Sequence, residues 1–238
     1  MIVSIMQPYF FPYIGYFQLI YHCDLFVLLD DVQYIKRGWV NRNRILMNGK
    51  PLYVTLPVLY ASRVLNINQR VYQLDKEIVK RLIKRIEGAY HNAPYFQETM
   101  PLIREIMGSS DSNVAAFNAN LVSRIAQRLA LETPITLSSR LEKDATLRRE
   151  ERLIEICRVV GASEYVNPSG EVDLYSAASF GPRGITLRFL KPSISPYRQF
   201  EAPHVPNLSV IDALMFNSPE QMRNLLQEFS LRTPPAAP

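Results

Sequence analysis

Two stretches near the N-terminus combine side chains that suit the binding and conversion of a small anionic molecule. The first is QPYFFPYIGY, residues 7–16, in which two prolines stiffen an aromatic-rich segment. Stiffness lowers the entropic cost of presenting a binding surface. We expect Gln7 to make polar contacts and Gly15 to permit close approach of a ligand or of backbone. Further substrate contacts are expected from Tyr9, Tyr13 and Tyr16. An aromatic lid packed over the sheet edge is the structural alternative.

The second stretch begins with two adjacent carboxylates, Asp30 and Asp31, directly after the apolar run LFVLL. A carboxylate at a strand end can act as a general base, bind a divalent cation or hold a basic neighbour. Arginine suits bidentate contact with phosphate, and an aromatic ring can stack on a base or sugar. The predicted substrate-binding residues here are Tyr34, Lys36, Arg37, Trp39, Asn41, Arg42 and Arg44. A charged surface turn with Asp–Arg pairs is the alternative.

Two further ionisable residues lie near the C-terminus. His204, in a proline-punctuated loop, has a side chain whose ordinary pKa suits acid–base work, with a structural or surface role as the alternative. Asp212 interrupts the apolar helix pattern NLSVIDALMF, either as a buried partner of a cation or as an exposed residue. The predicted catalytic set is therefore Asp30, Asp31 and His204. No metal site is predicted, and no cofactor is named by the sequence.

A compact βαβ unit must position these stretches. Residues 2–6 and 25–29 are continuous apolar runs typical of buried strands, and a helix is expected from Gly15 between them. Such a unit makes the strands parallel, with a right-handed crossover. Ligands of parallel sheets bind beyond the carboxyl ends of the strands. We therefore expect Gln7 and Asp31 to face each other across one pocket.

The remaining pattern predicts an α/β fold with a mostly parallel sheet, in a nucleotidyltransferase-like or Rossmann-like layout. Asn48-Gly49 indicates a β-hairpin. A helical segment is expected over about 74–131, and strands over 135–139, 163–167 and 185–190. Helices are expected over 146–161, 208–216 and 219–229, and a surface loop, with a short helix as the alternative within it, over 168–184. We predict one domain, residues 1–232, and a disordered tail, residues 233–238.

Composition narrows the class of protein. The 238 residues are 47% hydrophobic and 21% charged, which is ordinary for a globular chain. There is no apolar run long enough to span a bilayer, no signal-peptide pattern, and only two cysteines, so a cytoplasmic location is expected. The net charge of +5 is compatible with an anionic small-molecule substrate, and we expect neither nucleic acid nor membrane as a partner. A homodimer is compatible with the sequence. Dinucleotide-fingerprint, P-loop, nucleophile-elbow and zinc motifs are absent from the sequence.

Three blocks resemble the WbqC-like family: QPYFFPYIGYFQLI, DLFVLLDDVQYIKRGWVNRNRIL and NLSVIDALMFNSPEQ. Members of that family occur with genes of bacterial surface-polysaccharide (O-antigen) biosynthesis. The resemblance implies a cytoplasmic role in making or modifying an activated sugar. Together with the side chains at the strand ends, it leads to the hypothesis of a transferase that adds an acyl or aminoacyl group, such as glycyl, to a nucleotide-linked amino sugar. One alternative is an accessory protein of the same pathway that binds the nucleotide-linked sugar. Another is a nucleotidyltransferase-like enzyme whose HIGH motif is altered to Tyr13-Ile14-Gly15-Tyr16, with tyrosines in place of both histidines.

Overall fold

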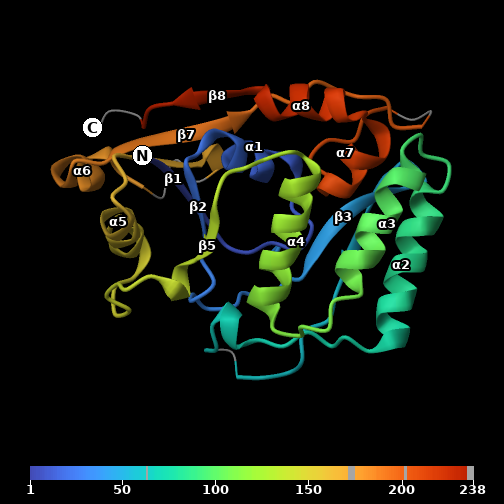
Figure 1. The fold of residues 1–238 in the computed structure, drawn as a ribbon, viewed down its shortest axis with the longest axis horizontal. Coiled ribbons are helices and arrows are strands. Elements are labelled where there is room, and N and C mark those ends of the chain that lie inside the picture. Colours follow the sequence, from blue (N-terminus) through green and yellow to red (C-terminus); the bar gives the residue numbers. More distant parts are fainter. Residues whose placement is uncertain (63, 171–174, 201–202, 235–238) are drawn as a thin grey trace.

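A six-stranded sheet in the order β5-β2-β1-β6-β7-β8 organises the fold (Figure 1). The computed structural model describes the chain except residues 63, 171–174, 201–202 and 235–238. The strands of this sheet are β1 (Ile2–Met6), β2 (Leu25–Leu28), β5 (Ile135–Leu137), β6 (Glu164–Pro168), β7 (Thr186–Pro192) and β8 (Phe229–Arg232). All neighbours pair in parallel except β7 and β8, which are antiparallel. The predicted α/β fold with a mostly parallel sheet is confirmed.

The predicted βαβ unit is also confirmed. Helix α1 (Ile14–His22) connects β1 to β2, which pair in parallel from Val3 opposite Leu25 to Met6 opposite Leu28. Side chains alternate between the two faces of the sheet, because successive residues of a strand point to opposite sides. Val3 and Val27 pack in the cluster that includes α5, whereas Leu28 packs in the larger cluster that includes α1. Both faces are thus covered, which explains why these strands are apolar except at Ser4, whose buried hydroxyl donates to the carbonyl oxygen of Val166.

The predicted helical segment forms a layer beside the sheet and its hairpin. It contains α2 (Lys76–Tyr90), α3 (Phe96–Met107) and α4 (Val114–Arg128). The other helices are α5 (Arg149–Val160), α6 (Ala177–Phe180), α7 (Val210–Phe216), α8 (Pro219–Gln227) and the short 3-10 turns η1 (Ile67–Gln69), η2 (Ser138–Arg140) and η4 (Gly181–Arg183). Caps fix several of their starts. The Asp75 carboxylate accepts from two amides at the start of α2, and Ser218 forms a capping box with Gln221 at the start of α8.

The hairpin predicted at Asn48-Gly49 consists of β3 (Arg42–Met47) and β4 (Lys50–Thr55). Both turn residues have positive φ, 51° at Asn48 and 73° at Gly49. Positive φ at both central residues is the signature of a type I′ turn, which matches the twist of paired strands. This hairpin forms a second sheet of its own and carries the basic stretch away from β2.

The last predicted helix is too long, and parts of two other predicted segments lie outside the described residues. The helix predicted to Phe229 ends at Gln227, and residues 229–232 form β8 instead. Phe229 and Leu231 are half-buried while Ser230 and Arg232 are exposed, which is the alternation of a strand. Residues 235–238 of the predicted tail and residues 171–174 of the predicted surface loop lie outside the described residues. Among the helices that the structure describes, none combines the length and apolar character needed to cross a membrane.

Candidate functional site

The two chemical stretches begin at one edge of the sheet. Because β1 and β2 are parallel neighbours, with Met6 opposite Leu28, the residues that follow them leave the sheet at the same edge. Gln7 and Asp31 therefore start from adjacent strand ends, as predicted. The two stretches share one cavity, whereas Asp31 lines a different one. The stretches therefore meet at a pocket, as expected, but Asp31 is not part of it.

The first cavity lies between the ends of β1 and β6. The chain continues from β1 to β2 on one side and from β6 to β7 on the other, so the direction of the connections switches here. β2 lies on one side of β1 and β6 on the other. In open parallel sheets the crevice at such a switch point is the usual ligand site. The cavity measures about 450 Å³ and includes the last residues of both strands, Met6 and Pro168. We call it the aromatic cavity. Its other walls include Tyr9, Tyr13, Trp39, Asn43, Arg44 and Asn207.

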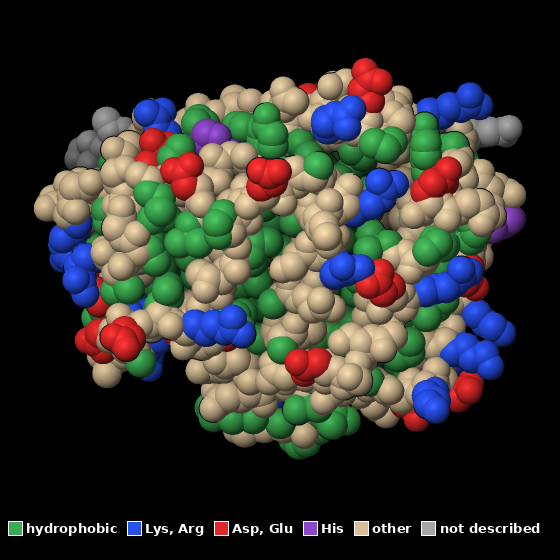
Figure 2. Space-filling view, in the orientation of Figure 1, with side chains coloured by type: hydrophobic (Ala, Val, Ile, Leu, Met, Phe, Trp, Pro, Cys, Tyr) green, Lys and Arg blue, Asp and Glu red, His purple; other side chains and the backbone are tan. Residues whose placement is uncertain are grey.

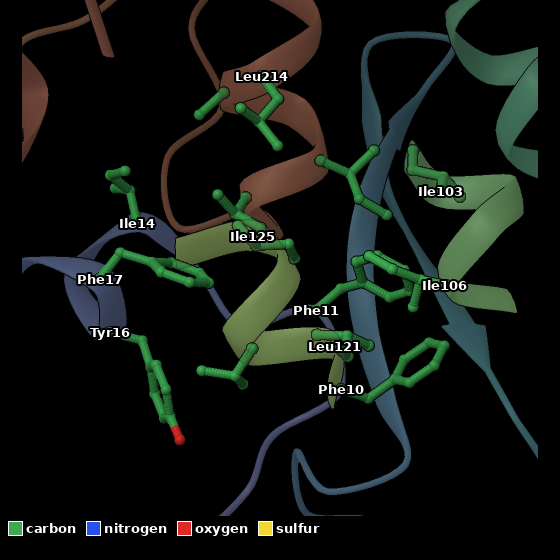
Figure 3. Close-up of a cluster of buried hydrophobic side chains, with 14 of the residues drawn as sticks. Phe10, Phe11, Ile14, Tyr16, Phe17, Ile103, Ile106, Leu121, Ile125 and Leu214 are labelled. Atoms are coloured by element: carbon green, nitrogen blue, oxygen red, sulfur yellow. The ribbon is translucent and has the colours of Figure 1, made fainter. Parts of the chain in front are cut away.

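Some side chains of the aromatic segment pack in the core, and others line the cavity. Phe10 and Phe11 point into the core among α3 and α4 (Figure 3), and both are buried. Tyr9 and Tyr13 are only partly buried and reach the cavity. The buried amide of Asn43 donates to the carbonyl oxygens of Phe10 and Phe11, at 3.2 and 2.8 Å. The packed lid and the binding surface are therefore both present in one segment.

The remaining predicted residues of this segment have positioning roles. Tyr16 is fully buried, and its hydroxyl donates to the carbonyl oxygen of Gln7 at 2.9 Å. Burial raises the pKa of Tyr16 well above its usual value. Neither Gln7 nor Gly15 is among the residues that line the aromatic cavity. The ring of Tyr13 fills the space beside Gly15. The close approach that this glycine permits is therefore made by a side chain of the protein itself and not by a ligand.

Arg44 and Trp39 form the polar and aromatic walls of the cavity. The Arg44 guanidinium carbon lies 5.5 Å from the centre of the Trp39 ring, and its Nη2 donates to the carbonyl oxygen of Asn207 at 3.0 Å. The Arg44 Nε is buried and has no hydrogen-bond partner among the described residues. The ring of Tyr53 also stacks on Trp39, with the two ring centres 6.3 Å apart. A held guanidinium with unused donor capacity next to aromatic rings suits an anionic group attached to a planar ring.

The second cavity lies beyond β2 and is lined by Asp31 and by basic residues. It measures about 400 Å³ and includes Arg148, Arg149 and Arg152, so we call it the arginine cavity. Asp31 is ion-paired with the buried Lys143, at 2.8 Å, and more distantly with Arg152, at 3.7 Å. Its Oδ1 is buried without a hydrogen-bond donor in the described part of the chain. The structure thus bears out the alternative in which Asp31 holds basic neighbours.

Asp30 is a fully buried structural acceptor. Its Oδ1 accepts from the amide of Ser139 at 2.9 Å, and its Oδ2 accepts from the Ser139 hydroxyl at 2.6 Å. Asn68 donates to Oδ2 as well, at 3.3 Å. These bonds connect the end of β2 to the segment after β5 and to η1. Both carboxylate oxygens are therefore occupied.

Two of the predicted binding residues are buried away from both cavities. Tyr34 lies under the guanidinium of Arg70, whose carbon is 5.0 Å from the ring centre. The Asn41 amide donates to the carbonyl oxygen of Leu56 at 3.0 Å and so fixes the chain after β4. Both side chains support the fold around the hairpin.

Three predicted cations lie on the surface next to the hairpin. Lys36 Nζ is 5.8 Å from the centre of the Tyr60 ring, and Arg37 is exposed. Arg42 covers the ring of Tyr53 at 4.4 Å and donates to the carbonyl oxygens of Gly38 and Arg37. None of the three lines a cavity with Arg44 in the described structure.

His204 and Asp212 belong to a third cluster, at the loop before α7. The Asp212 carboxylate accepts from the hydroxyls of Tyr90 and Tyr197, at 2.9 and 2.7 Å, and from the Gln199 amide. Burial raises the pKa of Asp212, and the hydrogen bonds offset part of that rise. His204 packs on the Tyr197 ring. The buried alternative for Asp212 is correct, but its partners are neutral rather than cationic.

Five residues line the aromatic cavity but are not among the predicted site residues: Met6, Asn43, Pro168, Gly170 and Asn207. Pro168 reaches the site because β6 pairs with β1, and no local pattern reveals that pairing. Asn207 is the first residue of the block NLSVIDALMFNSPEQ, which resembles the WbqC-like family, and this position is the signal that could have drawn attention to it. Within the described ranges, no group of three or more His, Cys, Asp or Glu side chains is arranged to hold a metal ion.

Comparison with known proteins identifies a family but no activity. The chain is 27% identical over 220 residues to an uncharacterized protein of Mycobacterium tuberculosis, Rv1507c, covering 90% of this chain and 93% of that protein. No solved structure matches the chain. The WbqC-like protein family matches residues 7–224, which include both cavities and the Asp212 cluster. The chain therefore belongs to the WbqC-like protein family.

Proposed function

We propose that the protein is a cytoplasmic transferase of bacterial surface-polysaccharide biosynthesis that adds an acyl or aminoacyl group, such as glycyl, to a nucleotide-linked amino sugar. The observation that carries the proposal is the aromatic cavity at the switch point of the sheet, with Arg44 beside Trp39, Tyr9 and Tyr13. Its volume of about 450 Å³ lies in the range of pockets that bury small molecules.

The cavity offers the two kinds of contact that a nucleotide-linked sugar requires. Aromatic rings stack on a base or on the apolar face of a sugar. Arg44 can donate to a phosphate through the buried Nε that has no partner in the described structure. The Asn43 carboxamide supports this wall, because its oxygen accepts from the amide of Arg44 at 2.8 Å.

The transfer step needs a base near the acceptor amine. The amine nitrogen attacks the acyl carbonyl carbon, a carbon–nitrogen bond forms, and the bond from that carbon to the donor's leaving group breaks. The proton lost by the amine passes through the base to the leaving group. Within this proposal Asp31 is the preferred base, because Asp30 has both oxygens occupied whereas the Asp31 Oδ1 has no hydrogen-bond donor among described residues. His204 is the second choice.

One observation favours the non-catalytic alternative, a protein that binds the nucleotide-linked sugar for a neighbouring enzyme. Asp31 is held by Lys143 and Arg152, and it lines the arginine cavity rather than the aromatic cavity. A carboxylate paired with two cations is a weaker base than a solvated one. Turnover must therefore be measured separately from binding.

The test combines calorimetry with mass spectrometry. A panel of nucleotide-linked amino sugars is titrated into the wild type and into Arg44→Ala, with Arg85→Ala, an exposed arginine on α2, as the matched control. We expect binding that weakens by about tenfold or more in Arg44→Ala alone, the loss typical of a charged hydrogen bond. Incubation with acyl and aminoacyl donors should then add the acyl mass to the sugar, and Asp31→Asn should abolish the gain. Binding without turnover with any donor would establish the accessory role, and no binding at all would refute both.

A further inference from the structure

Four exposed apolar side chains form a projecting surface, which we call the apolar tip: Ile35, Leu59, Tyr60 and Val64. Their exposed fractions are 61%, 47%, 94% and 74%. The chain brings them together, since Tyr34 donates its amide to the carbonyl oxygen of Leu65 and Lys36 lies over the Tyr60 ring. In Figure 2, hydrophobic side chains gather on the projection at the bottom of the view, where Figure 1 shows the loop that follows β4.

The fold does not require these side chains to be apolar. Their neighbours Tyr34 and Ile67 enter the core, while the tip residues point outward. Contiguous exposed apolar surface on a globular protein marks a contact with another molecule or with a membrane. A tip that projects outward can insert into a fluid lipid surface, whereas a protein partner requires a complementary pocket.

The stretch of the chain that carries the tip is rich in positive charge. Between Asp31 and Asp75 the sequence contains no Asp or Glu and seven Lys or Arg residues. These seven positive charges exceed the net charge of the whole chain, which is +5, so the rest of the chain is net negative. Exposed cations lie near two of the tip residues. Lys36 lies over the Tyr60 ring, and Arg148 and Arg149 line the arginine cavity together with Val64.

We propose that the apolar tip docks the protein on an anionic lipid surface. The aliphatic side chains enter the headgroup region, Tyr60 lies at the interface, and the flanking cations contact lipid phosphates. Three of the four tip residues are aliphatic and cannot read or stack on nucleotides, which favours lipid over nucleic acid. A scan for long apolar runs misses this surface, because short stretches far apart in the chain assemble it. The proposal does not depend on the ligand of the aromatic cavity.

Vesicle flotation with the full chain tests the proposal. We expect the protein to float with phosphatidylcholine vesicles that contain phosphatidylglycerol, to remain unbound with phosphatidylcholine alone, and to dissociate at high salt. The double variant Tyr60→Ser/Val64→Ser should weaken binding by about tenfold, and Lys36→Glu should weaken it too. Tyr21→Ser, at an exposed tyrosine on α1, and Lys191→Glu, at an exposed lysine on β7, are the matched controls and should bind normally.

Because the altered side chains are exposed, the variants should keep the melting temperature of the wild type, which is measured alongside. Absence of binding to anionic vesicles at low salt would overturn the proposal. So would unchanged binding by Tyr60→Ser/Val64→Ser. If the tip variant instead loses affinity for a structured RNA that the wild type binds, the surface is a nucleic-acid surface and the lipid assignment is wrong.

Discussion

The ring of Tyr13 occupies the space that a side chain at Gly15 would need. A Cβ atom at position 15 would lie 2.4 Å from Cε2 and 2.7 Å from the hydroxyl oxygen of Tyr13. Both distances are far below van der Waals contact. Since Tyr13 forms a wall of the aromatic cavity, the missing side chain at Gly15 determines where that wall stands.

Gly15→Ala is therefore expected to displace the Tyr13 ring and to weaken ligand binding. The clash should cost about 1–3 kcal/mol of unfolding free energy. In the Tyr13→Ala background the same change should instead stabilise α1 by about 1 kcal/mol, the usual gain of alanine over glycine in a helix. Gly88→Ala in α2, where nothing lies within 4 Å, is the control and should also stabilise. Denaturant unfolding measures all four variants, and equal effects of Gly15→Ala in both backgrounds would contradict the contact.

Trp39 is the only tryptophan, so its fluorescence reports on the aromatic cavity alone. A ligand that stacks on the ring or displaces Arg44 should change its emission. Trp39→Phe should remove the signal while calorimetry still detects binding, because a ring remains. Trp39→Ala should weaken binding by about tenfold or more, the loss typical of a stacked base. Ligand binding that leaves the emission of the wild type unchanged would show that the ligand lies elsewhere.

Local patterns predicted most of the helices and strands, but they did not predict which strands pair when they lie far apart in the sequence. Asn48-Gly49 predicted the hairpin, and two apolar runs around a short helix predicted the βαβ unit, because each signal resides in adjacent residues. The pairing of β1 with β6 depends on long-range packing. It is this pairing that creates the switch point and the aromatic cavity, so the second wall of the site could not be predicted.

The different environments of Asp30 and Asp31 also could not be predicted from the local sequence. Both residues follow the end of β2 at Leu28, where the side-chain alternation of a strand no longer applies, and Asp30 is buried while Asp31 lines a cavity. Which of the two is buried depends on Ser139 and Lys143, over a hundred positions away along the chain. β8 was not predicted because it has only four residues and follows a helix directly. So few residues cannot distinguish the two-residue period of a strand from the 3.6-residue period of a helix.

Asp30→Ala should lower stability rather than catalysis alone. The change leaves the amide and hydroxyl of Ser139 and the amide of Asn68 without their buried acceptor. Unsatisfied buried groups of this kind should cost about 3 kcal/mol together. Glu132→Ala, at an exposed glutamate between α4 and β5, is the control and should change stability by less than about 0.5 kcal/mol. Urea unfolding decides the point: an Asp30→Ala protein with wild-type stability and no turnover would make Asp30 a catalytic residue instead.

The two cysteines should make stability fall at alkaline pH. Cys23 and Cys157 are buried and free, and burial raises the pKa of each thiol to about 12. In the unfolded chain a thiol ionises near pH ~8.5. A folded-state pKa above the unfolded value gives stability that is complete below the unfolded pKa and is lost as pH rises toward the folded pKa. Each thiol should therefore cost about 1.4 kcal/mol of unfolding free energy per pH unit above pH ~8.5, before the tyrosines begin to ionise near pH ~10. A Cys23→Ala/Cys157→Ala variant should show a flatter decline over this window in urea unfolding.

The native thiols should resist alkylation at neutral pH and react once urea unfolds the chain, and rapid labelling of the folded protein would contradict their burial.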